Sequence, residues 1–131
     1  MATTLASLRD VHVAWAWVLV MSNGLAGVWA LGAHWIPGLR SRALWWFIVF
    51  AELAVFIQVA LGVGLIAGQK LSAPKFHLFY GFVAIISVGI LYGYRDAPWM
   101  RNRLYQWYGF GGLFVMGLGI RAMLVAQAGA H

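Results

Sequence analysis

Three ionisable side chains in mostly apolar sequence could carry chemistry: His12, His77 and Arg121. Titratable residues inside apolar runs are costly in a membrane, which makes them functional candidates. An imidazole nitrogen binds iron, and axial ligation is the main attachment of a haem to its protein. The two histidines together therefore predict an iron site. Each histidine taken alone is more typical of an interfacial residue that contacts lipid headgroups.

Glu52 and Gln58 are further polar candidates and lie in one apolar run. The carboxyl group of Glu52 could relay protons, contact a quinone or another subunit, or form a hydrogen bond with Asn23 or Gln58. We favour a structural hydrogen-bonding role, because polar groups inside membrane bundles usually bond across helices.

Four apolar runs must position these side chains, at about 11–36, 43–68, 76–94 and 104–126. The chain is 63% hydrophobic and only 9% charged, whereas soluble domains carry about 25% charged residues. Each run reaches or approaches the roughly 20 residues that cross about 30 Å of hydrocarbon. Short loops make neighbouring helices antiparallel. The sequence therefore predicts a single all-α domain, a four-helix transmembrane bundle with both termini on the same side.

Basic residues give this bundle an orientation. We call the side that holds both termini side A and the opposite side B. Side A contains Arg9, Lys70 and Lys75, and side B contains Arg40, Arg42, Arg95, Arg101 and Arg103. The excess on side B predicts that it is cytoplasmic and that both termini lie outside. We expect an integral protein of a bacterial cytoplasmic membrane.

This topology brings the chemical candidates to similar depth. His12 and His77 begin the first and third helices on side A, and parallel helices placed diagonally can present two imidazoles to the two faces of one haem. Gly81 follows His77 and Ala16 follows His12 by one turn on the same helical face, which leaves room for a porphyrin. Arg121 lies near the side A end of the fourth run. Its guanidinium suits haem propionates, although snorkelling to headgroups also explains it.

Several classes of function are not indicated. The absence of cysteine excludes disulfides, thiolate metal sites and cysteine nucleophiles. The sequence contains no phosphate-binding loop, no serine–histidine–acid set and no carboxylate cluster. The net charge of +6 arises from short clusters between apolar runs, which indicates membrane topology and not nucleic-acid binding. We expect no stand-alone catalytic activity.

Three short motifs resemble one four-helix half of the haem A synthase family. They are VHVAWA around His12, QVALG at Gln58 to Gly62, and FHLFYG around His77. The resemblance implies that His12 and His77 are axial ligands of a haem b near the outer face. That family has eight helices in two halves, so the resemblance does not extend to its oxidation chemistry. The layout is also similar to that of small bacterial four-helix membrane proteins.

The leading hypothesis is a cytochrome b-like protein with one haem, active in electron transfer or haem handling, as a subunit of a respiratory complex or alongside one. Its predicted partners are the lipid bilayer and other membrane subunits. The alternative is a cofactor-free accessory subunit that packs against a larger complex through its glycine faces. A transporter that moves protons through Glu52 is a third class, but the paired inverted halves common in transporters are missing.

Overall fold

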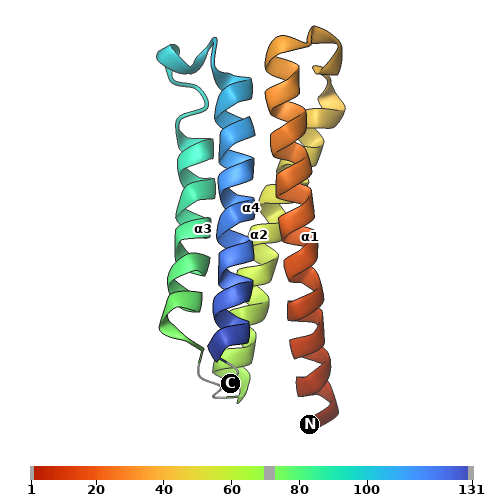
Figure 1. Cartoon of the computed structure of the whole chain (residues 1–131), viewed down its shortest axis with the longest axis vertical. Helices are drawn as coiled ribbons and strands as arrows, with labels where there is room; N and C mark the ends of the chain where they lie inside the picture. The colour runs from red at the N-terminus through yellow and green to blue at the C-terminus, as the bar shows by residue number, and fades with distance from the viewer. Residues whose placement is uncertain (1, 70–72, 130–131) are drawn as a thin grey trace.

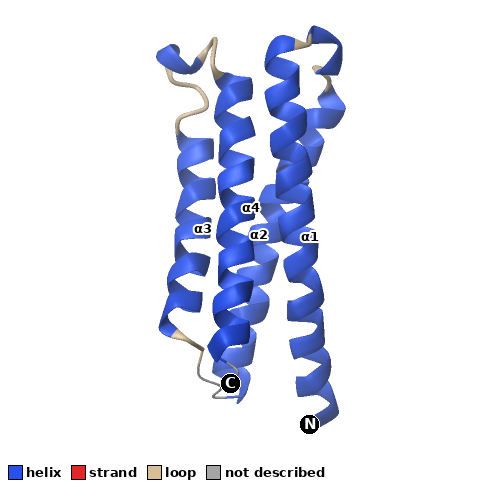
Figure 2. Ribbon diagram, in the orientation of Figure 1, coloured by secondary structure: helices blue, strands red, loops and turns tan. Residues whose placement is uncertain are grey.

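The computed structural model describes residues 2–69 and 73–129; Lys70, one of the side A basic residues, lies outside them. Four long helices form an antiparallel bundle: α1 (Ala2–Trp35), α2 (Arg42–Gln69), α3 (Lys75–Gly93) and α4 (Leu104–Gly129). Figure 1 shows that α1 begins and α4 ends at the same end of the bundle, and Figure 2 shows helices joined by short connections. The prediction of an all-α four-helix bundle is confirmed.

All four helices are long and apolar enough to cross a membrane, over Ser7–Trp35, Arg42–Gly68, Lys75–Gly93 and Leu104–Gln127. Large apolar side chains point outward, as expected for lipid contact; Trp46 is 71% and Phe82 is 65% exposed. The first helix begins at Ala2 and so extends to the N-terminal side of the apolar run predicted from about Val11. The polar residues before Val11 contain neither proline nor glycine, so nothing in their sequence interrupts the helix.

Prolines lie in the connections between the helices, and one arginine caps a helix end. Short 3₁₀ turns begin at Pro37 (η1, Pro37–Leu39) and at Pro98 (η2, Pro98–Met100), and Pro74 immediately precedes α3. The guanidinium of Arg40 donates hydrogen bonds to the carbonyls of Ala33 (2.7 Å) and His34 (2.8 Å). These carbonyls have no partner inside the helix, so Arg40 caps the side B end of α1.

Helices α1 and α4 form the closest contact of the bundle through glycines. A Cβ atom at Gly112 would lie 2.8 Å from the carbonyl oxygen of Asn23 and 3.0 Å from the Cα of Gly27. A Cβ at Gly109 would lie 2.5 Å from the Leu31 side chain. The backbones approach this closely only because these positions lack a side chain.

Indole and amide groups join α1 to α2. The Asn23 side chain is buried and donates to the carbonyls of Leu19 (2.9 Å) and Ala51 (3.1 Å). Nearer side A, the indole of Trp15 donates to the carbonyl of Ala54 at 2.9 Å. In contrast, α3 packs mainly against α4 and contacts α2 only slightly. Helices α1 and α3 are therefore diagonal in the bundle, as predicted.

Candidate functional site

The side chains of His12 and His77 meet at the side A end of the bundle, although they come from diagonal helices. Their ring centroids are 6.1 Å apart, and the ring planes are inclined by 76°. Imidazoles on opposite sides of one metal ion, with metal–nitrogen bonds of about 2.0–2.1 Å, have centroids roughly 6 Å apart. The same separation also suits an edge-to-face contact between two rings. The hydrogen bonds of each ring must therefore decide between these two interpretations.

One nitrogen of His77 has a fixed role. Its Nδ1 lies 2.9 Å from the carbonyl oxygen of Ala122 on α4. A carbonyl only accepts hydrogen bonds, so Nδ1 must carry the proton in this contact. In a neutral ring the lone pair is then on Nε2. Metal-binding histidines usually have this arrangement, with the second ring nitrogen donating to a carbonyl or carboxylate.

The surroundings of His12 contain two buried polar atoms without a partner. Nδ1 of His12 and Oε1 of Gln58 are both buried and form no hydrogen bond within the described residues. The amide nitrogen of Gln58 donates to the backbone carbonyl of His12 at 2.7 Å, which ties α2 to α1 beside the ring. Buried polar atoms without partners are rare and often mark a functional site or a missing ligand.

Gly62 provides the surface on which the His12 ring lies. A Cβ atom at position 62 would be 3.2 Å from Cε1 of His12 and 3.8 Å from Nε2. A Cβ at 3.2 Å is already tighter than an ordinary van der Waals contact, so a side chain here would press against the ring. Across the bundle, a Cβ at Gly81, one turn after His77, would have no atom within 4 Å. The His12 ring thus fills the space at Gly62, whereas the position of Gly81 beside His77 is open.

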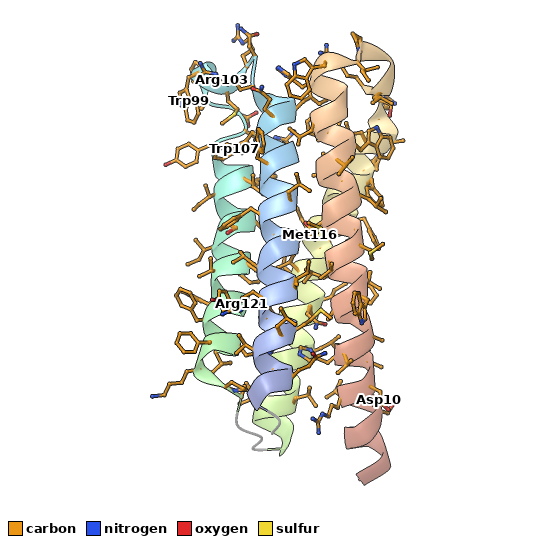
Figure 3. The ribbon with its side chains drawn as sticks, in the orientation of Figure 1. Asp10, Trp99, Arg103, Trp107, Met116 and Arg121 are labelled. Atoms are coloured by element: carbon orange, nitrogen blue, oxygen red, sulfur yellow. The ribbon has the colours of Figure 1, made fainter. Side chains whose placement is uncertain are left out.

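Arg121 lies next to the same site. Its Nε donates to the hydroxyl of Tyr80 at 3.4 Å, and Tyr80 shares the face of α3 that carries His77. Arg121 also directly precedes Ala122, whose carbonyl accepts from His77. Figure 3 shows Arg121 in the half of the bundle that contains the termini. Its side chain is exposed, so the guanidinium is accessible to an anionic group.

The two imidazoles alone could not complete a metal site. Over residues 2–69 and 73–129, no group of three or more His, Cys, Asp or Glu side chains is placed to hold a metal ion. Protein sites for bare zinc normally use three or four such ligands. A porphyrin supplies four nitrogens of its own and needs only axial ligands from the protein. The donor set therefore fits a haem better than a free ion.

Glu52 and His34 lie apart from this cluster. Oε1 of Glu52 is buried without a hydrogen-bond partner among the described residues. Asn23 and Gln58, the two partners considered for it, donate to backbone carbonyls. The His34 ring lies at the side B end and packs edge-on against Trp35, with centroids 4.8 Å apart.

Two contacts of the site did not follow from the sequence. Tyr80 was not identified as a partner of Arg121, although its position three residues after His77 places it on the same helical face. The bond from His77 to Ala122 depends on a backbone carbonyl, which exists at every position and gives no signal in residue types.

No protein-family model, no curated protein and no solved structure matches this chain. The resemblance to the haem A synthase family therefore stays a prediction.

Proposed function

We propose that this chain is a small membrane cytochrome b-like protein that holds one haem b between His12 and His77. The contact from Nδ1 of His77 to the carbonyl of Ala122 carries the proposal, because it leaves Nε2 as the ligand nitrogen. The second imidazole lies at 6.1 Å, a separation suited to two axial ligands of one ion. Electron transfer or haem handling, beside or within a respiratory complex, is the function that such a site supports.

The chain's own residues have distinct roles in this proposal. His12 and His77 bind the iron, and Ala122 orients His77 through its carbonyl. Gln58 fixes the backbone of His12 through its amide nitrogen. Arg121 and Tyr80 pair with a propionate, since arginine binds carboxylates strongly and keeps its charge in apolar surroundings. Bound haem would supply one-electron redox chemistry, and its two ligands and surroundings would set its potential.

A reduced-minus-oxidised absorption spectrum of the purified protein tests the presence of the cofactor. The protein should be expressed with adequate haem supply and kept in mild detergent. We expect haem b bands with about one haem per chain. A protein that folds but shows no haem bands, even after addition of haemin, would contradict the proposal.

The outer face of α3 supports a second candidate, the cofactor-free accessory subunit. A Cβ at Gly89 or Gly93 would have no atom within 4 Å, and the two residues form a GxxxG pair. Such pairs allow close contact with another membrane helix. Stable co-purification with a larger complex, without haem, would favour this function. A protein that contains haem and purifies without other subunits would count against this function.

A further inference from the structure

A groove at the side B end, far from the histidines, has no role in the proposed function. It runs between α3 and α4 beneath η2 and has a volume of about 490 Å³. We call it the α3–α4 groove. Ser87 and Ile90 line it from α3, Phe110 and Phe114 line it from α4, and Trp99 and Arg103 lie at its end. Its volume falls in the range of roughly 300–1,000 Å³ that is usual for small-molecule sites.

The length of the groove matches one leaflet of the membrane. Along the chain it extends from Arg103, the residue before α4, to Phe114 within α4. At 1.5 Å per residue, this stretch is about 16 Å long. One leaflet holds about half of the roughly 30 Å of hydrocarbon. The groove therefore extends from the loop at the side B end into this leaflet, where an acyl chain can lie along its apolar part.

The two ends of the groove differ in chemistry. Its membrane part is lined by apolar side chains, including Ile90, Phe110 and Phe114. Its outer end carries Arg103, in a loop that contains three arginines and one aspartate between positions 95 and 103. Figure 3 shows Arg103 beside Trp99, with Trp107 nearby on α4. Tryptophan is enriched at the level of the lipid headgroups, so Arg103 is placed at headgroup depth.

The wall of the groove is held in place by specific contacts. The indole of Trp107 donates to the carbonyl of Leu91 at 2.9 Å and so joins α4 to α3. The ring centroids of Trp99 and Trp107 are 6.3 Å apart, and Met100 of η2 is only 1% exposed. These contacts therefore hold the end of the groove that carries Arg103 in a fixed position relative to its apolar part.

We propose that the α3–α4 groove binds one anionic phospholipid of the side B leaflet. Arg103 contacts the phosphate of the headgroup, and one acyl chain lies along Phe110 and Phe114. Charge complementarity selects this occupant, because basic pockets between membrane helices bind anionic headgroups. A quinone carries no net charge and would gain less from an arginine-rich loop. This inference does not depend on the haem.

Native mass spectrometry of the full-length, delipidated protein tests the site. The protein is titrated with phosphatidylglycerol and, separately, with phosphatidylcholine of the same chains. We expect one phosphatidylglycerol to bind more tightly than any phosphatidylcholine. Arg103→Ala should weaken this first binding about fivefold, the effect of one basic residue near a charged headgroup. Arg101→Ala also removes one positive charge from the loop, but Arg101 does not line the groove. The affinity of this variant for phosphatidylglycerol should therefore stay within about twofold of the wild type.

A second variant tests the apolar part. Phe114→Ala should weaken the first binding of phosphatidylglycerol, whereas Phe82→Ala, an exposed phenylalanine of α3 outside the groove, should not. Equal binding of the two lipids would overturn the proposal. Equal effects of Arg101→Ala and Arg103→Ala would also overturn the proposal. They would indicate that the basic loop as a whole attracts anionic lipid and that Arg103 makes no specific contact. A quinone that co-purifies and displaces the bound lipid would overturn the proposal as well.

Discussion

Each histidine is held by a hydrogen bond to a neighbouring helix, through the ring in His77 and through the backbone in His12. The carbonyl of Ala122 receives the Nδ1 proton of His77, and the amide of Gln58 holds the backbone of His12. Such partners fix the tautomer and orientation of a metal ligand. Among the other histidines, His34 packs against Trp35 at the opposite end. It is therefore a suitable control residue for experiments on the site.

Substitution of Gly62 tests whether the position of the His12 ring matters. Gly62→Val places its methyl groups against a ring that a Cβ alone would approach to 3.2 Å. We expect haem affinity to fall by at least about tenfold, as for other residues that orient metal ligands. Gly68→Val is the matched control in the same helix, because no atom lies within 4 Å of its Cβ position. Titration of the purified variants with haemin measures the difference. Equal affinities would show that the ring is not positioned by Gly62.

At the scale of the helices, hydrophobicity and loop signals were sufficient to predict the bundle. Apolar length identified the four spans, and Pro37 and Pro98 marked two of the connections. Depth along the membrane followed from the same boundaries, so the level of His12 and His77 could be anticipated. The rotation of each helix about its own axis could not be predicted, because the spans are apolar on every side. Contacts that depend on rotation, such as Gly62 against His12, therefore emerged only from the structure.

The glycine contact between α1 and α4 gives a prediction on stability. Gly112→Ile introduces a side chain where a Cβ would already lie 2.8 Å from a backbone oxygen of α1. Overpacking of this kind costs about 1–3 kcal/mol. We expect a lower midpoint in thermal unfolding of the detergent-solubilised protein. Gly117→Ile, at an open position of the same helix, should change the free energy of unfolding by no more than about 0.5 kcal/mol. A Gly112→Ile variant as stable as Gly117→Ile would contradict the close packing.

At the scale of the whole molecule, the two ends of the bundle differ in charge and in proposed role. Side A brings together both histidines and Arg121, while side B carries the α3–α4 groove and most of the arginines. The excess of basic residues predicts that side B faces the cytoplasm. The proposed haem would then lie near the outer surface, and the lipid site in the inner leaflet.

The absence of cysteine makes this topology directly measurable. Single cysteines are introduced by Asn102→Cys in the side B loop and by Ala73→Cys in the side A loop. In intact cells, a thiol reagent that does not cross membranes should label Ala73→Cys and leave Asn102→Cys unlabelled until the cells are opened. The reverse pattern would show that side A is cytoplasmic.

The haem content of histidine variants shows whether His77 is an axial ligand. The measurement is haem b per chain in His77→Ala and His34→Ala, each purified and checked for helical content. We expect His77→Ala to bind haem at least about tenfold more weakly than the wild type and so to contain less haem per chain. His34→Ala should contain as much haem as the wild type. His77→Gly with added imidazole should recover haem, which separates loss of the ligand from misfolding. Unchanged haem content in folded His77→Ala, or equal loss in His34→Ala, would contradict the assignment of His77 as an axial ligand.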